Sequence, residues 1–235
     1  MKIALLGYGK MGKVIEKIAT DRGHEIVVRK DQNNNFDGLE NADVAIDFSV
    51  PNSAVANISQ CLTNGIPVIS GTTGWLAAYP DMVSLCEAKN GGFIYASNFS
   101  LGVNVFFELN DYLAKMMATL KQYNVSIEEI HHTQKLDAPS GTAITLAEGV
   151  IKNSDYVNWT LETPISNEIH IDAKRVENVP GTHSIFYDSE VDQIQIKHTA
   201  HSREGFALGA VVAAEWLCNK KGVFTMKDVL GLNQK

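Results

Sequence analysis

The sequence predicts an α/β fold in which a doubly wound parallel sheet is interrupted by an inserted α+β domain of mostly antiparallel sheet. Three observations predict it. Short β-branched runs alternate with helical segments over residues 1–100, and a glycine-rich turn joins the first run to the first helical segment. From Gly102 the pattern changes to one long amphipathic helix followed by a series of strands.

Composition limits the possible functions. With 235 residues, of which 45% are hydrophobic and 20% charged, the chain can form one large domain or two modest ones. A net charge of −7 argues against nucleic-acid binding. Cys61, Cys86 and Cys218 share no metal-type or disulfide spacing, which favours reduced thiols in the cytoplasm. The apolar run 3–6 is too short for a signal peptide or a membrane span, so we expect no membrane partner.

The first part of the chain carries the pattern of a parallel sheet covered by helices. Apolar residues recur at helical intervals over 10–21 and 52–63, between the β-branched runs. The predicted strands are 2–6, 25–29, 43–48, 67–70 and 92–95.

The second part begins with a helix whose apolar residues run from Val103 to Leu120. Strands are predicted at 123–131, 168–175, 183–187 and 192–199, with a helix at 141–152 between the first two. The last helix, 205–218, is apolar and rich in small residues, so we expect it to pack on the first domain. The predicted domains are therefore 1–101 with 205–235, and 102–204 as an insertion.

A glycine fingerprint follows the first strand. Gly7, Gly9 and Gly12 form a G-x-G-x-x-G pattern between a strand and a helix. Gly7 permits the tight turn, Gly9 lets the backbone approach a pyrophosphate, and Gly12 allows close helix packing. An ordinary glycine turn is the alternative, but the flanking strand and helix favour a Rossmann-like dinucleotide site. The predicted site includes the intervening Tyr8, Lys10 and Met11.

Two cations end the second strand. An acidic residue there usually binds the ribose 2′-hydroxyl of NAD, whereas this chain has Arg29 and Lys30. Two cations suit the 2′-phosphate of NADP, so NADPH is preferred to NADH as the predicted cofactor. The alternative is that Arg29 and Lys30 are solvent-exposed basic residues beside Asp31 that bind no phosphate.

Two further loops follow predicted strands of the same sheet. Loops at the carboxyl ends of parallel strands line the ligand crevice, so both are candidates for nucleotide binding. Either loop alone is also compatible with ordinary turn chemistry. The candidate residues are Gly71, Thr72 and Thr73 in one loop, and Ala96, Ser97, Asn98 and Phe99 in the other.

The densest chemistry lies between residues 129 and 143. His131 and His132 end a predicted strand, so their side chains point in different directions. Lys135 adds a cation, and Gly141 and Thr142 begin the next helix, where free amides carry partial positive charge. This combination predicts a binding site for a small dicarboxylate.

Two other interpretations of this segment were considered. Ser140 can act as a plain helix cap, with His131 and His132 as surface histidines. A zinc site is disfavoured because no third ligand is grouped with the two histidines, although Asp137 is conceivable in that role. We therefore expect no metal.

These motifs resemble those of one enzyme family. The run from His131 to Ala143 resembles the signature of the 4-hydroxy-tetrahydrodipicolinate reductases, also called dihydrodipicolinate reductases. The resemblance covers nearly the whole chain in the same order. It includes Gly7–Gly12, Gly71–Gly74, Asn98–Asn104, Pro180–His183, His198–Arg203 and Phe206–Leu217.

The resemblance implies an enzyme that reduces 4-hydroxy-tetrahydrodipicolinate to tetrahydrodipicolinate with NADPH or NADH, in diaminopimelate and lysine biosynthesis. It implies that His131 donates and accepts protons and that Lys135 is a second proton donor. It also implies that His132, Gly141 and Thr142 bind the dicarboxylate. The glycine fingerprint and the two loops would bind the nucleotide. The family forms homotetramers through the sheets of its inserted domain.

The chain departs from the family pattern at three places. Arg29 and Lys30 replace an acidic residue and an arginine, so we expect weaker use of NADH. Ser97 stands where many relatives have proline or alanine. Residues 31–42 are few for the family, so a crossover helix is expected to be missing there.

Two rival functions share the glycine fingerprint. One is a different two-domain dehydrogenase, acting on an amino-acid-derived aldehyde or amine, and the other is a non-catalytic sensor of the nucleotide pool. Neither gives a reason for the cluster between His131 and Thr142. Sequence patterns assign no role to Arg175, His183 or Arg203, which each lie near a predicted strand end.

Overall fold

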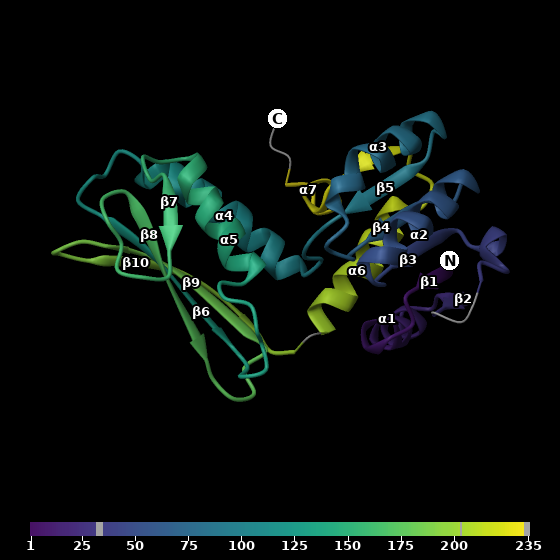
Figure 1. Cartoon of the computed structure of the whole chain (residues 1–235), viewed down its shortest axis with the longest axis horizontal. Coiled ribbons are helices and arrows are strands. Elements are labelled where there is room, and N and C mark those ends of the chain that lie inside the picture. The colour runs from purple at the N-terminus through teal and green to yellow at the C-terminus, as the bar shows by residue number, and fades with distance from the viewer. Residues whose placement is uncertain (32–34, 203, 233–235) are drawn as a thin grey trace. The chain divides into compact units, whose positions relative to one another are not determined.

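The computed structural model describes residues 1–31, 35–202 and 204–232. The chain divides into two compact units, one formed by Met1–Leu101 with Glu204–Lys235 and the other by Gly102–Arg203. Each unit has a sheet of its own (Figure 1). No helix among the described residues is both long enough and apolar enough to cross a membrane.

The first unit contains a six-stranded parallel sheet in the order β11-β5-β4-β3-β1-β2. The chain runs from β1 outward to β2 and then returns across β1 to β3. The strand order therefore reverses at β1 and β3, and ligands of open α/β sheets bind at the carboxyl ends of such strands. The strands are β1 Lys2–Leu6, β2 Glu25–Lys30, β3 Val44–Asp47, β4 Val68–Ser70, β5 Gly92–Tyr95 and β11 Gly222–Phe224.

Helices cover both faces of this sheet, because its strands are apolar on both sides. Along β1, Ile3 and Leu5 join one buried cluster, while Ala4 and Leu6 join another. The first cluster includes residues of α1 and α6, and the second includes residues of α2 and α3. The helices are α1 Lys10–Asp21, α2 Pro51–Thr63, α3 Tyr79–Ala88, α6 Glu204–Leu217 and α7 Met226–Val229. The predicted doubly wound sheet is thus confirmed.

The second unit contains a five-stranded sheet in the order β10-β9-β6-β8-β7. Helices α4 and α5 pack on it through a shared core, in which Phe106 and Leu146 meet Ile127 and Ile185. The elements are α4 Leu101–Met117, β6 Asn124–His131, α5 Gly141–Lys152, β7 Asn158–Thr160, β8 Glu168–Arg175, β9 Gly181–Asp188 and β10 Gln193–Ala200.

This second sheet is mixed, whereas a mostly antiparallel sheet was predicted. Strand β6 pairs antiparallel with β9 but parallel with β8, and β8 pairs parallel with β7. The reason is two successive connections, α5 between β6 and β7 and the loop 161–167 between β7 and β8, each of which returns the chain to the end where the preceding strand began. A strand reached by such a crossover runs parallel to the first.

Some elements were not predicted from the sequence. They are α3, β7, β11 and α7, the last three being only three or four residues long. Between β2 and β3, the described residues form a single 3₁₀ turn, η1 Leu39–Asn41, so the expected loss of a crossover helix is confirmed for that part of the chain.

Candidate active site

The glycine fingerprint forms an open cradle at the end of β1. Gly7 has a φ of +109°, and a Cβ atom there would lie 2.1 Å from the carbonyl oxygen of Phe48. A Cβ at Gly12 would lie 2.3 Å from the carbonyl oxygen of Gly7. By contrast, a Cβ at Gly9, which precedes α1, would meet nothing within 4 Å. The amides that start α1 are therefore accessible, which fits the pyrophosphate of a dinucleotide.

A cavity of about 270 Å³ opens beside this cradle. Four of the predicted nucleotide residues line it: Gly7, Tyr8, Gly9 and Lys30. Its other walls come from Asp31 after β2, from the loop after β3 and from α2, and these residues were not predicted. A signal was available for the loop and α2, because the polar residues Ser49 and Ser53 follow closely after the buried strand β3. The missed lining residues are Asp31, Phe48, Ser49, Val50, Ser53 and Asn57.

The two cations at the end of β2 have different environments. Arg29 pairs with Glu16, with its Nε donating to Oε1 at 2.9 Å, and its guanidinium lies 6.0 Å from the centroid of the Tyr8 ring. Lys30 lines the cavity, and its Nζ lies 5.0 Å from the centroid of the Phe36 ring. Lys30 is therefore the better placed of the two for a bound phosphate.

The two loops predicted to bind the nucleotide, 71–73 and 96–99, are partly buried. Thr72 is buried and donates to Asp47, and Phe99 is buried against Phe48 with ring centroids 5.7 Å apart. Asn98 is also buried, whereas Thr73 and Ser97 are exposed. Among the described residues, those from 71–73 and 96–99 are not part of the lining of the cavity. Their binding of the nucleotide stays a prediction.

A buried carboxylate holds the strand ends of the first unit together. Asp47, at the end of β3, is 0% exposed and accepts hydrogen bonds of 2.7–2.8 Å from Ser49, Asn57, Ser70 and Thr72. Burial raises the pKa of Asp47, and the four donors offset part of that increase. These bonds connect β3, α2 and the loop after β4.

In the second unit, the chemistry lies at the carboxyl end of β6. Buried and partly exposed residues alternate along this strand, and its buried face ends with Glu129 and His131. His183 of β9 is the cross-strand partner of Glu129, and Arg175 of β8 is the partner of His131. The sheet register therefore brings Arg175 and His183, which are far away in the sequence, next to Glu129 and His131.

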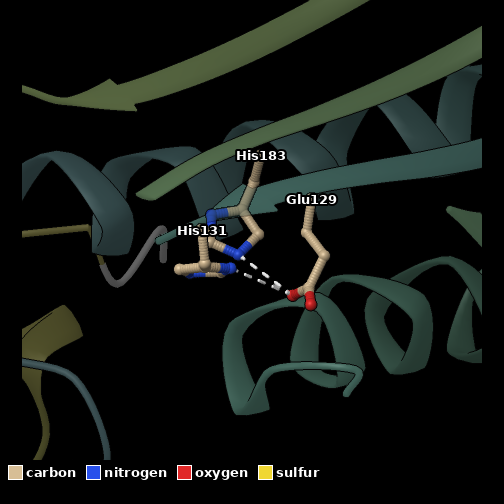
Figure 2. Close-up of side chains that lie close together, drawn as sticks. All are labelled: Glu129, His131 and His183. Atoms are coloured by element: carbon tan, nitrogen blue, oxygen red, sulfur yellow. Dashed lines mark ion pairs between the residues drawn. The ribbon is translucent and has the colours of Figure 1, made fainter. Parts of the chain in front are cut away.

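Glu129 lies at the centre of this group. Its carboxylate is 0% exposed, accepts a 2.9 Å hydrogen bond from the Ser140 amide, and lies 3.3 Å from Nη1 of Arg175. The imidazoles of His131 and His183 both point toward it, each with a nitrogen 3.7 Å from Oε2 (Figure 2). Burial would raise the pKa of Glu129, but hydrogen bonding to His183 and Ser140 and the proximity of His131 outweigh it and lower the pKa to about 2.

His131 is held as a neutral base. Burial, followed by the proximity of His183, lowers its pKa to about 4, although Glu129 acts in the opposite direction. Lys135 and Arg175 add to the lowering. Its Nδ1 atom is buried and has no hydrogen-bond partner among the described residues. A neutral imidazole can accept a proton and return it, so His131 has the chemistry of a general acid and base.

The start of α5 completes the group. The Ser140 hydroxyl caps the helix by accepting from the Ala143 amide at 3.2 Å, and it lies 3.0 Å from Nε2 of His183. Gly141 is exposed, and a Cβ there would meet nothing within 4 Å, so the first amides of α5 have room for an anion.

The preceding loop carries the second predicted proton donor. Lys135 is partly exposed, and its Nζ donates to Asp137 at 2.6 Å. Arg175 fixes this loop by donating to the carbonyl oxygens of Lys135 and Asp137 at 3.3 and 2.6 Å. Arg203 lies outside the described residues.

Further potential metal ligands do lie beside His131 of β6, contrary to the expectation from the sequence. Glu129 and His183 do lie with His131, and the three ligand atoms are within 4.8 Å of one another. The missing third ligand is therefore no longer a reason to dismiss a metal. The expectation of no metal now rests on Arg175 and the Ser140 amide, which already supply the carboxylate with positive partners.

Comparison with known proteins identifies the family. The family described as "Dihydrodipicolinate reductase, N-terminus" matches residues 1–99, and "Dihydrodipicolinate reductase, C-terminus" matches residues 102–230. A 4-hydroxy-tetrahydrodipicolinate reductase of Christiangramia forsetii is 58% identical over 234 residues, covering 98% of each chain. A protein of the same name from Methanosarcina barkeri is 36% identical, covering 96% of this chain and 83% of that relative.

A solved structure supports the fold. The dipicolinate-bound dihydrodipicolinate reductase from Paenisporosarcina sp. TG-14 superposes with a TM-score of 0.74, at 23% identity over 96% of this chain and 97% of that one. Together with the two family matches, which span nearly the whole sequence, these relatives show that the chain belongs to the dihydrodipicolinate reductase family.

Proposed function

We propose that this chain reduces 4-hydroxy-tetrahydrodipicolinate to tetrahydrodipicolinate with a reduced nicotinamide nucleotide, in diaminopimelate and lysine biosynthesis. The observation that carries the proposal is the convergence of His131, Lys135 and the open start of α5 at one end of the second sheet. This arrangement combines proton donors with an anion site, in a chain whose relatives carry the name of this reaction.

The first unit is the proposed nucleotide-binding domain, and the second is the proposed substrate-binding domain. The glycine cradle fits the pyrophosphate because the amides at the start of α1 are open and no Cβ fills the space at Gly9. When bound, the nucleotide supplies the hydride for ring carbon 4 of the dehydrated substrate. Residues of the chain itself bind the substrate and supply the proton.

The substrate carries two carboxylates, and the second unit has groups suited to both. His132, Lys135 and the amides of Gly141 and Thr142 would hold them. Two nearby negative charges raise the pKa of an imidazole, so substrate binding would let His131 take up a proton. His131 or Lys135 would then deliver a proton to the ring carbon next to carbon 4, which completes the reduction.

The finer points of the proposal concern cofactor, location and assembly. NADPH is the preferred nucleotide, because Lys30 lines the cavity beside the fingerprint. The cytoplasm is the expected location, which suits the free thiols of Cys61, Cys86 and Cys218. A homotetramer is the expected assembly, to be tested by light scattering on the purified protein.

The reaction can be tested in one assay. The unstable substrate is generated in the cuvette from pyruvate and aspartate semialdehyde by the preceding synthase, and nucleotide absorbance is followed with NADPH and NADH in parallel. We expect rapid oxidation that pyridine-2,6-dicarboxylate inhibits competitively with the substrate. Nucleotide binding without oxidation, and without binding of this inhibitor, would favour a different dehydrogenase or a nucleotide sensor.

A further inference from the structure

The segment at the start of β9, residues 180–183, was noted in the sequence but has no role in the reaction as described. The structure places two of its residues against the proposed proton donor. A Cβ at Gly181 would lie 3.2 Å from Nε2 and 3.4 Å from Cδ2 of His131. The imidazole of His131 therefore lies directly over the Gly181 backbone, in space that a side chain would occupy.

His183 contacts the same imidazole from another direction. The ring centroids of His131 and His183 are 5.0 Å apart, with an interplanar angle of 71°. This edge-to-face arrangement is one that aromatic rings favour. His183 is only 5% exposed, so its ring cannot be displaced into solvent without opening the core.

His183 also reaches the anion site. Its Nε2 lies 3.0 Å from the Ser140 hydroxyl, which in turn caps α5 through the Ala143 amide. The same nitrogen is 3.7 Å from Oε2 of Glu129 (Figure 2). Glu129 also contacts His131, the Ser140 amide and Arg175. The side chain of His183 thus contacts both His131, the proposed proton donor, and Ser140, which caps α5.

We propose that Gly181 and His183 are positioning residues that hold the His131 imidazole in register with the start of α5. The proposal rests on the proposed function, since it assigns how His131 is aligned for proton transfer to a bound dicarboxylate. Neither residue needs to touch the substrate. Gly181 leaves the space in which the ring lies, and His183 fixes the ring and, through Ser140, the helix cap.

Alignment of this kind has a large effect on rate because proton transfer depends on sub-ångström geometry. The charge around His131 is set from three strands and a loop. The groups that face it are Glu129 on its own strand, His183 on β9, Arg175 on β8 and Lys135 in the loop. Removing His183 therefore changes the alignment of His131 and also one contribution to its ionisation.

The test compares four variants of the full-length protein. His183→Leu keeps the volume but removes the polar contact, and we expect kcat to fall about 10- to 100-fold. His183→Gln places a nitrogen near the position of Nε2 and should restore most of this loss. Gly181→Ala should lower kcat less, by crowding the His131 ring. His170→Gln, a histidine of β8 outside the cluster, is the matched control and should behave like wild type.

Three further readouts separate positioning from general damage. The dissociation constant for NADPH should stay close to wild type in His183→Gln and Gly181→Ala. The thermal midpoint should stay close to wild type in His183→Gln and fall in Gly181→Ala, because Gly181 has a φ of +159°, which a residue with a side chain adopts only with strain. The ionisation of His131, followed by NMR of its imidazole in the free protein, should move to higher pH in both His183→Leu and His183→Gln, because both remove a neighbour that lowers its pKa. Turnover should recover only in His183→Gln.

The inference is overturned if His183→Leu and Gly181→Ala keep wild-type kcat, or if His183→Gln is as impaired as His183→Leu. Should His183→Leu fail to fold, Gly181→Ala and His183→Gln still decide the matter through kcat and the His131 titration. Wild-type protein that does not oxidise the nucleotide at all would instead refute the proposed function. The two failures are therefore distinguishable.

Discussion

Two carboxylates, Asp47 in the first unit and Glu129 in the second, are both 0% exposed, yet their environments are opposite. Asp47 is surrounded by neutral donors, three hydroxyls and one amide. Glu129 faces a guanidinium, two imidazoles and a backbone amide. Burial acts on both, but the pKa of Asp47 is raised, whereas that of Glu129 is lowered to about 2.

The difference shows how partners, rather than burial, decide the charge of an interior carboxylate. The neutral donors around Asp47 connect strand ends and supply no positive charge to it. Around Glu129, the Arg175 guanidinium balances the carboxylate, so this pair adds no net negative charge that would repel an anionic ligand. By this comparison the first region organises loops, and the second is the proposed site of chemistry.

The largest expected effect tests whether the second unit supplies the proton donors while the first unit binds the nucleotide. A double substitution, His131→Ala with Lys135→Ala, should lower kcat by at least about 10²–10⁴-fold, because one general acid alone contributes that much. The NADPH dissociation constant should not change, since neither residue belongs to the first unit. Stopped-flow absorbance and fluorescence titration measure the two quantities. Lys174→Ala, a lysine of β8 that pairs with Glu128, is the control.

The next effect tests the buried charge of the second unit. Glu129→Gln leaves the Arg175 guanidinium without its carboxylate, and removal of one partner of a buried pair costs about 3–5 kcal/mol. Urea denaturation should show this loss in the free energy of unfolding. Glu128→Gln, which alters a neighbouring pair nearer the surface, should cost no more than about 1 kcal/mol. Equal effects of the two variants would refute a special role for Glu129.

The corresponding change in the first unit should be milder. Asp47→Asn exchanges one acceptor oxygen for a donor, and the surrounding hydroxyls can reorient, so we expect a loss of about 1–3 kcal/mol. NADPH affinity should fall as well, because Ser49 and Asn57 line the cavity. Asp43→Asn, an exposed aspartate before β3, should change neither quantity. If Asp47→Asn binds NADPH as tightly as wild type, Asp47 does not support the nucleotide site.

The two carboxylates should also give opposite pH dependences of stability. The lowered pKa of Glu129 stabilises the fold above its ordinary value of 4.5, and this contribution disappears as pH falls from 4.5 toward 2. The raised pKa of Asp47 means that stability decreases as pH rises from 3.8 through its folded value. Unfolding free energies measured across this range for Glu129→Gln and Asp47→Asn should therefore differ from wild type with opposite slopes.

The smallest expected effect concerns the two cations at the end of β2, Arg29 and Lys30. Lys30→Ala should weaken NADPH binding about tenfold, the size of one charge-assisted hydrogen bond, with little change for NADH. Arg29→Ala should have less effect, because Arg29 is already paired with Glu16. If fluorescence titrations show that Arg29→Ala weakens NADPH binding more than Lys30→Ala does, then Arg29 and not Lys30 binds the 2′-phosphate.

Local patterns predicted much of this molecule. The glycine fingerprint was found because its pattern depends on spacing within six residues, Gly7–Gly12, and the main strands and helices have clear periods. The cluster around Glu129 was only half predicted. His131 and Lys135 are close in sequence, but Arg175 and His183 join them only through strand register, which no local pattern encodes. Glu129 itself gave a signal, as a charged residue in the buried alternation of β6.

The hydrogen bonds of Asp47 and the mixed sheet also depend on contacts that no local sequence pattern encodes. Four donors reach Asp47 from three segments, and the parallel pairing of β6 with β8 depends on where α5 returns the chain. Strands of three residues, such as β7 and β11, are too short to show a period. These features depend on tertiary structure, so they were not predictable from a single sequence.

The most direct test of the proposed reaction is to follow the transferred hydrogen. NADPH carrying deuterium at the reactive position of nicotinamide carbon 4 would be incubated with the protein and freshly generated substrate, and the product analysed by mass spectrometry. We predict one deuterium in the ring of tetrahydrodipicolinate, and formation of this labelled product at a rate at least about 100-fold lower by the His131→Ala, Lys135→Ala double variant. A product without deuterium, or no reduced product from wild-type protein that binds both ligands, would contradict the proposed function.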